Sequence, residues 1–221
     1  MKLIYVGDPM CSWCYGFGKE LSEVLAAEPE LSLEIVVGGL RAGGTEVLDA
    51  AGKQFRLTHW ARVQAASGLP FNREAFMARE GFVYDTGPIC RAVVVARTLA
   101  PEAPLLDVFR ALQHAFYVDG VDTTDPETLA RVTAQALTKA GHPVDTETAL
   151  RQYHAASTIK ATADDFRTAR ALGISSFPAL LMEAGGVHYA VAPGYASAAE
   201  ILDNIAAVRA RVDVEAKSAV H

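Results

Sequence analysis

The spacing of apolar residues predicts a strand, a helix and a second strand at the start of the chain. Residues 3–7, LIYVG, form a short apolar run of the kind that lies buried on both faces of a sheet. From residue 14 to residue 27 apolar side chains recur at helical spacing, and Pro29 ends this pattern. Residues 31–37, LSLEIVV, predict the second strand. Strand, helix and strand in this order predict a βαβ unit with a right-handed crossover.

The middle of the chain, from about residue 45 to residue 160, carries helical spacing and almost no strand-like run. Asp125 before Pro126 is typical of a helix N-terminus, and Gly141 with Pro143 just beyond it is typical of a helix C-terminus. We therefore predict an all-helical insertion.

The C-terminal part returns to mixed structure. Residues 161–174 predict a helix, and the runs ALLMEA at 179–184 and VHYAVA at 187–192 predict two strands joined by a tight glycine turn. A last helix covers about residues 198–211, and we expect residues 213–221 to fray.

These elements together predict an α/β fold in which two mixed halves flank a helical block. We expect an N-terminal βαβ half over residues 1–44, an all-helical insertion over residues 45–160, and a C-terminal αββα half over residues 161–221. The carboxyl end of the first strand, where α/β proteins usually carry their sites, is the first place to look for chemistry.

Composition and charge narrow the range of partners. The chain has 221 residues, of which 51% are hydrophobic and 21% are charged, an ordinary balance for a globular protein. Its formal net charge of −6, without any Lys/Arg-rich run, argues against a nucleic-acid partner. No apolar stretch is long enough to span a bilayer, so we expect no membrane partner. The sequence does not give the oligomeric state.

The first residues lack the features of an exported protein. Only the run LIYV precedes Gly7 and Asp8, whereas a secretory signal needs a longer apolar region followed by small residues. The chain also starts with Met1, and its three cysteines are too few for a disulfide-stapled scaffold. We therefore expect a cytoplasmic protein.

Two cysteines, Cys11 and Cys14, lie between the first strand and the first helix, within the stretch DPMCSWCYGF. A CxxC motif beside a βαβ unit is typical of a thioredoxin-like redox site. The helix N-terminus favours the thiolate of Cys11, because unpaired N–H groups and the helix dipole stabilise negative charge there. We predict that Cys11 is the nucleophile and that Cys14, one turn further on and more buried, resolves the mixed disulfide.

Two other roles for the CxxC motif are weaker. A structural zinc site needs a second Cys/His pair, and the six histidines are scattered without one, so we predict no metal. A structural disulfide across so short a spacing closes a small loop and restricts the unfolded chain little. The third cysteine, Cys90, lies in the apolar helical segment PICRAVVVA, and we expect it to be a small buried side chain.

Further side chains near the motif are candidates for the site. Asp8, three residues before the motif, is either a base that accepts the Cys14 proton or a turn residue before Pro9, and both interpretations stay open. We expect Trp13 to be exposed at the site and Phe17 to lie in the core.

The CSWC motif after the first strand, the helical insertion and the segment GISSFPAL at residues 173–180 together resemble the DsbA-like branch of the thioredoxin superfamily. The resemblance covers roughly residues 1–211, and DPMCSWCYGF is similar to the FrnE-like, cytosolic DsbA-like subgroup. It implies a thioredoxin fold with a large all-helical insertion and a cis peptide bond before Pro178, a residue that by itself would only mark the start of a strand. The residues that it implies for substrate binding are Ser12, Trp13, Phe177 and Pro178.

The same resemblance implies a thiol–disulfide oxidoreductase that reduces, forms or isomerises disulfides of proteins or small molecules through a mixed disulfide. It implies no bound cofactor, with glutathione as an open co-substrate and the glutathione or thioredoxin system as redox partner. The dipeptide Ser12-Trp13 differs from the Pro-His of periplasmic oxidants and from the Gly-Pro of thioredoxins. In a reducing cytosol the resting form is a dithiol, which favours a reductase or isomerase over an oxidant.

Two alternative functions remain. Glutathione-dependent isomerases and transferases of the hydroxychromene carboxylate and kappa classes resemble the same architecture, but they generally carry a serine where this chain has Cys11. A non-catalytic binding or chaperone role would use an apolar cleft around Trp13, Phe177 and Tyr195.

Overall fold

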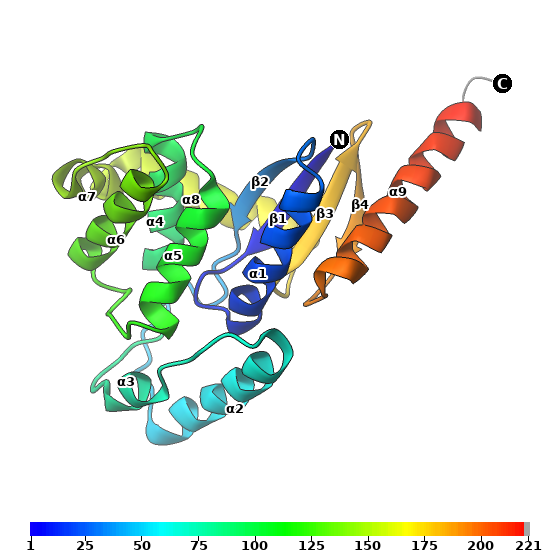
Figure 1. Cartoon of the computed structure of the whole chain (residues 1–221). Helices are drawn as coiled ribbons and strands as arrows, with labels where there is room; N and C mark the ends of the chain where they lie inside the picture. Colours follow the sequence, from blue (N-terminus) through cyan, green and yellow to red (C-terminus); the bar gives the residue numbers. More distant parts are fainter. Residues whose placement is uncertain (219–221) are drawn as a thin grey trace.

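Four strands form one mixed sheet at the centre of the molecule (Figure 1). The computed structural model describes residues 1–218. The strands are β1 (Lys2–Gly7), β2 (Ser32–Val37), β3 (Ala179–Ala184) and β4 (Val187–Ala192), and their order in the sheet is β2-β1-β3-β4. β1 pairs in parallel with β2, whereas β3 is antiparallel to both β1 and β4. The N-terminal and C-terminal parts of the fold are therefore joined by the β1–β3 pair.

The central strand β1 is buried on both faces, as its apolar run predicts. Leu3 and Tyr5 lie in the main core, whereas Ile4 and Val6 lie in a second apolar cluster on the opposite face, together with Ala169. Helices α1 and α9 cover one face of the sheet, and α8 covers the other (Figure 1). The bounds of these helices are α1 (Ser12–Ala27), α8 (Ala156–Ala171) and α9 (Ala198–Ser218).

A block of helices separates β2 from α8, as the middle of the sequence predicts. Its members are α2 (Ala50–Ser67), α3 (Arg73–Ala78), α4 (Gly87–Leu99), α5 (Leu105–Tyr117), α6 (Pro126–Lys139) and α7 (Thr146–His154). Helices α4 to α7 gather on the β2 side of the sheet, while α2 and α3 lie at the end where α1 begins (Figure 1). Asp125 caps α6 by accepting the N–H of Thr128 at 2.7 Å, and Gly141 follows that helix with a φ of +84°, as predicted.

The start of α8 differs from the prediction. The helix begins at Ala156 and not near residue 161, because Ala155 alone separates it from α7 with an extended backbone (ψ 134°). The expected division of the chain between residues 160 and 161 therefore falls inside α8.

The C-terminal helix is also longer than the prediction. α9 continues to Ser218 and does not end near residue 211. Arg211 and Glu215, one turn apart on this helix, form an ion pair of 2.8 Å, and such pairs support helical structure. The last part of the tail that was expected to fray, residues 219–221, lies outside the described residues. Throughout the described part, no helix combines the length and apolar character needed to cross a membrane.

Candidate active site

Cys11 occupies the N-cap position of α1, directly after the carboxyl end of β1. Its backbone is extended (φ −80°, ψ 117°), and its carbonyl accepts the N–H of Tyr15 at 3.1 Å, the first hydrogen bond of the helix. The unpaired N–H groups of the first turn therefore lie beside its thiol. Cys11 and Cys14 are both free thiols; Cys11 is 8% exposed, whereas Cys14 is fully buried.

The two thiols have opposite electrostatic surroundings. The pKa of Cys11 is lowered, chiefly because the Cys14 thiol donates a hydrogen bond to the Cys11 thiolate, with further help from the N–H groups of Cys14 and Trp13. Burial and the charge of Asp8 oppose this shift without cancelling it. The pKa of Cys14 is raised well above its usual value, because burial disfavours its charged form and the Cys11 thiolate repels it. The first negative charge of the pair therefore lies on Cys11.

A segment from the far end of the sequence faces Cys11. The Phe177–Pro178 peptide bond, just before β3, is cis. The carbonyl oxygen of Phe177 accepts a hydrogen bond from Cys11 Sγ at 3.6 Å. The ring of Phe177 packs so closely on Gly38 that a Cβ there would lie 2.1 Å from it, so this position requires glycine. The pairing of β3 with β1 brings the two segments together.

Asp8 is fully buried and joins separate parts of the chain. One carboxylate oxygen accepts the N–H of Met10 at 2.8 Å, and the other accepts the N–H of Leu40 at 2.7 Å. The side chains of Thr86 and Cys90 also hydrogen-bond to this carboxylate. Asp8 therefore fixes the end of β1 against the loop after β2 and the start of α4. Nothing in the local sequence marks Leu40 or Thr86 as its partners.

Burial raises the pKa of Asp8 to about 6, although the hydrogen bonds that its oxygens accept oppose the shift. The contact between Asp8 and Cys14 is made by the main-chain N–H of Asp8, which lies 3.5 Å from Cys14 Sγ, and not by the carboxylate. The charge of Asp8 does reach Cys11, whose pKa it raises. The carboxylate contacts of Asp8 therefore join β1 to the loop after β2 and to α4, and no hydrogen bond runs from that carboxylate to Cys14.

Two tyrosines of the helical insertion hold Met10, the residue before Cys11. The carbonyl of Met10 accepts a hydrogen bond of 2.6 Å from the hydroxyl of Tyr117 at the end of α5, and a second one from the hydroxyl of Tyr84. Both phenols are buried, and the guanidinium of Arg56 lies 4.4 Å from the centre of the Tyr84 ring. Sequence reasoning missed these residues because they lie 107 and 74 positions from Met10, and no local pattern marks them.

The surface next to Cys11 is partly aromatic. Ser12 and Trp13 are half-buried at the start of α1, and the ring of Trp13 packs on that of Tyr195, with 5.4 Å between centroids. Arg62 of α2 lies 5.9 Å from the centre of the Trp13 ring. Phe17 is fully buried, as predicted.

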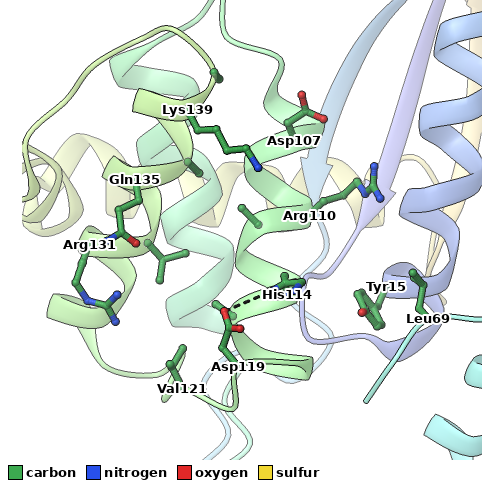
Figure 2. Close-up of a pocket in the computed structure, with 15 residues that line it drawn as sticks. Tyr15, Leu69, Asp107, Arg110, His114, Asp119, Val121, Arg131, Gln135 and Lys139 are labelled. Carbon is green, nitrogen blue, oxygen red and sulfur yellow. Dashed lines mark hydrogen bonds and ion pairs between the residues drawn. The ribbon is translucent and has the colours of Figure 1, made fainter. Parts of the chain in front are cut away.

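A cavity of about 710 Å³ opens between α5 and α6 and reaches Tyr15 near the start of α1 (Figure 2). Arg110 extends from α5 toward α1, and Lys139 extends from α6 toward α5 (Figure 2). His114 and Asp119 pair at 3.2 Å on its wall. None of the residues that the sequence predicts for the site lines this cavity. Across residues 1–218, no group of His, Cys, Asp and Glu side chains is arranged to hold a metal ion.

The sequence matches no protein-family model and no curated protein. Among solved structures the chain is similar to a proposed protein disulfide isomerase from Nitrosomonas europaea, with 29% identity, a TM-score of 0.83, and coverage of 95% of this chain and 98% of that one. It is also similar to the cytosolic disulfide reductase DsbM from Pseudomonas aeruginosa, with 22% identity, a TM-score of 0.75, and coverage of 97% of this chain and 100% of that one. DsbM has also been solved with glutathione. A 2-hydroxychromene-2-carboxylate isomerase matches with 14% identity and a TM-score of 0.62, over 98% of each chain.

These matches extend over nearly the whole chain, so they include the sheet, the helical insertion and the C-terminal helix. The fold is a thioredoxin fold with a large helical insertion, as the sequence predicts. The chain therefore has the fold of the DsbA-like proteins of the thioredoxin superfamily.

Proposed function

We propose that this protein is a thiol–disulfide oxidoreductase that uses Cys11 and Cys14 as its redox couple. The observation that carries the proposal is the arrangement of two free thiols at the N-terminus of one helix, one reaching the surface and the other buried beneath it. The lowered pKa of Cys11 supports its role as nucleophile, because the thiolate is the reactive form in disulfide exchange. The raised pKa of Cys14 supports a role in the second step only.

In the reducing direction, the Cys11 thiolate attacks one sulfur of a substrate disulfide. A bond forms between that sulfur and Cys11 Sγ, the substrate S–S bond breaks, and the first substrate thiolate leaves and takes a proton from water. Cys14 then loses its proton and attacks Cys11 Sγ, which releases the second substrate thiol. The substrate gains two electrons, and the protein is left with a Cys11–Cys14 disulfide that a redox partner must reduce.

We propose that substrate binds between the start of α1 and the segment before β3. The carbonyl of Phe177 lies 3.6 Å from Cys11 Sγ, so an extended chain beside Phe177 and Pro178 would bring its sulfur to the nucleophile. Ser12 and Trp13 form the opposite wall, and the packing of Trp13 on Tyr195 gives this wall an apolar surface.

A second cavity, of about 540 Å³, supports glutathione as a co-substrate. Arg41 and Arg56 line it, and the charge of Arg41 adds to burial in lowering the pKa of Arg56. Two guanidinium groups brought together in this way favour an anionic ligand such as a carboxylate. Tyr84 lines the same cavity and donates to the carbonyl of Met10, which connects the cavity to the loop of the nucleophile. The lining also includes the carboxylates of Glu46 and Asp49.

We place the protein in the cytoplasm as a reductase or isomerase. DsbM, which shares the fold, is a cytosolic disulfide reductase, and this likeness supports the proposal. Two substrates test whether Arg41 binds a carboxylate of the substrate. Oxidised glutathione carries carboxylates, whereas cystamine is a disulfide without them. Replacement of Arg41 by Ala is expected to slow reduction of oxidised glutathione and to leave that of cystamine unchanged.

A glutathione-dependent isomerase is the second candidate, because an isomerase of this type shares the fold. Such an enzyme activates the glutathione thiol and has no use for a second cysteine. Turnover of an electrophile that requires glutathione and survives the change Cys14→Ala would favour this candidate over the oxidoreductase.

The proposal is tested by trapping the mixed disulfide. Cys14→Ser is expected to accumulate a covalent adduct with a disulfide substrate at Cys11, visible by intact mass and reversed by dithiothreitol. Cys11→Ser is expected to form no adduct and to lose turnover. Cys90→Ala keeps both thiols of the site and is the control for loss of a buried cysteine. Full turnover by Cys11→Ser would contradict the proposal.

A further inference from the structure

The hydroxyl of Tyr5 is one of several buried side-chain polar groups that form no hydrogen bond within the described part of the chain. The side chain of Tyr5 in β1 is fully buried, and its hydroxyl has no partner within residues 1–218. Its ring is fixed on two sides, by Phe17 at 5.6 Å and by Phe109 at 5.4 Å between centroids. Most buried hydroxyls in native proteins are paired, because an unpaired one loses its hydrogen bonds to water without replacement. The missing hydrogen bond of the Tyr5 hydroxyl therefore suggests that this group has a function.

The sequence YVG directs this hydroxyl toward the cysteines. Side chains alternate along a strand, so Tyr5 and Gly7 lie on the same face of β1. A Cβ at Gly7 would lie 2.6 Å from the Tyr5 hydroxyl oxygen, which shows that the phenol lies over Gly7. Glycine at this position leaves the space through which the hydroxyl reaches the end of the strand.

At the end of the strand the Tyr5 hydroxyl meets Cys14. The N–H of Asp8, the residue after Gly7, lies 3.5 Å from Cys14 Sγ. The Tyr5 hydroxyl and the Cys14 thiol lie close enough to shift each other's pKa: the phenol lowers that of Cys14, while burial and the Cys14 thiolate raise that of Tyr5 well above its usual value. Tyr5 therefore keeps its proton and can donate a hydrogen bond.

The Asp8 carboxylate makes no hydrogen bond to the Cys14 thiol. Its two oxygens accept the N–H groups of Met10 and Leu40, and only its main-chain N–H contacts Cys14. Among the main influences on the Cys14 thiol, the Tyr5 hydroxyl is the side chain that favours its charged form.

We infer that the Tyr5 hydroxyl donates a hydrogen bond to the Cys14 thiolate while that thiolate resolves the mixed disulfide. This inference rests on the proposed oxidoreductase function and adds a residue to it. In the step, Cys14 gives its proton to water and its sulfur forms a bond with Cys11 Sγ. The bond between Cys11 and the substrate sulfur breaks, and the electron pair stays on the substrate sulfur, which takes up a proton. The cysteines are oxidised and the substrate sulfur is reduced.

The transient charge explains why the hydroxyl is unpaired in the resting protein. Cys14 is a neutral thiol in the dithiol form, because its pKa is raised, and a thiol is a weak acceptor. Negative charge forms on its sulfur only during resolution. A donor that is already in place, and that water does not compete with, stabilises charge at that moment without any rearrangement.

A single-turnover reaction with one molar equivalent of dithiobis(nitrobenzoate) separates the two steps. Attack by Cys11 releases the first coloured nitrobenzoate thiolate, and resolution by Cys14 releases the second. Tyr5→Phe is expected to leave the first phase unchanged and to slow the second by about tenfold or more, the usual effect of one hydrogen bond to a charged group. The control is Tyr153→Phe, which removes the hydroxyl of a buried tyrosine in α7 and is expected to leave both phases unchanged.

A second measurement separates a role in charge stabilisation from a role in packing. In a Cys11→Ser background, Tyr5→Phe is expected to raise the pKa of Cys14, which thiolate absorbance reports. Phenylalanine keeps the ring contacts of Tyr5, and thermal unfolding checks that the fold is retained. A second phase and a Cys14 pKa that both stay at the parent values would overturn the inference. Failure of the proposed function has a different signature, since the parent protein would then release only one equivalent.

Discussion

The hydroxyl of Tyr117 donates a hydrogen bond of 2.6 Å to the carbonyl of Met10, so the last residue of a helix in the insertion holds the residue directly before Cys11. Tyr84, which lies just before α4 in the sequence, donates a second hydrogen bond to the same oxygen. The insertion therefore contacts the loop that carries Cys11 and is not only an addition to the thioredoxin fold. Its two phenols fix the main chain from which Cys11 extends.

The pair of tyrosines is expected to be non-additive in stability. Tyr117→Phe leaves the Met10 carbonyl with one donor, and we expect the free energy of unfolding to fall by about 1 kcal/mol. The same holds for Tyr84→Phe. The double variant leaves a buried carbonyl without any donor, so its loss is expected to exceed the sum of the two single losses. Urea unfolding of the four proteins measures this coupling, and strictly additive losses would argue against the shared acceptor.

Asp8 is expected to make stability depend on pH. Burial raises its folded pKa from 3.8 to about 6, so the folded state holds the proton more tightly than the unfolded state. The resulting stabilisation is complete below the unfolded pKa and is lost as the pH rises through about 6, a change of about 3 kcal/mol. Asp8→Asn removes this titration. The difference in unfolding free energy between the parent protein and the variant is therefore expected to change by about 3 kcal/mol between pH 3.5 and pH 7. Urea unfolding at both pH values checks it, and a constant difference would contradict the buried, titrating carboxyl.

Asp8→Asn also tests how the charge of Asp8 affects the pKa of Cys11. The charge of Asp8 raises the pKa of Cys11, so Asp8→Asn is expected to lower it. Thiolate absorbance as a function of pH, measured in a Cys14→Ser background, reports the change. A Cys11 pKa that rises on removal of the charge would mean that Asp8 supports the thiolate by another route.

Gly38 is expected to tolerate no side chain. A Cβ at this position would lie 2.1 Å from the ring of Phe177, whose carbonyl faces Cys11. We expect Gly38→Ala to displace that segment, to lower the free energy of unfolding by about 1–3 kcal/mol and to slow attack on substrate disulfides. Gly194→Ala is the control, because nothing lies within 4 Å of a Cβ there. Equal unfolding midpoints for the two variants would contradict the packing of Phe177.

The ion pair of Arg97 and Asp165 is expected to matter more than pairs on the surface. It joins α4 to α8 with two hydrogen bonds, of 2.8 and 3.0 Å, and its side chains are only 32% and 12% exposed. Each partner also bonds to the main chain of β2. Asp165→Ala leaves a guanidinium without its counter-ion, and we expect a loss of about 3 kcal/mol. Glu147→Ala breaks the exposed pair with Arg151 and is expected to change the unfolding midpoint little.

The sequence predicted the features of the site that depend on local pattern. The apolar run before Cys11 and the helical spacing after Cys14 place the motif between a strand and a helix, and the structure has this arrangement. The boundary at α8 was wrong because a single extended residue, Ala155, is enough to separate two helices, and helical spacing continues through it. The spacing of apolar residues predicts which face of a helix is buried better than it predicts where the helix begins or ends.

The contacts that shape the thiols could not be predicted in the same way. Tyr84, Tyr117 and Leu40 reach Met10 or Asp8 across long stretches of sequence, and their positions depend on how the insertion packs. Tyr5 was hidden for another reason. Within an apolar strand a tyrosine counts as one more hydrophobic residue, and only the fold shows that its hydroxyl is unpaired and that Gly7 leaves space for it.

The most direct test of the central proposal is a redox titration of the thiols. The protein is equilibrated across glutathione buffers, and its thiols are alkylated and counted by intact mass. We expect a single two-electron transition that ends in a Cys11–Cys14 disulfide, with the buried Cys90 reduced throughout. The midpoint then ranks the protein as reductant or oxidant. A lasting glutathione adduct, or thiols that do not respond to the buffer, would contradict a redox couple at this site.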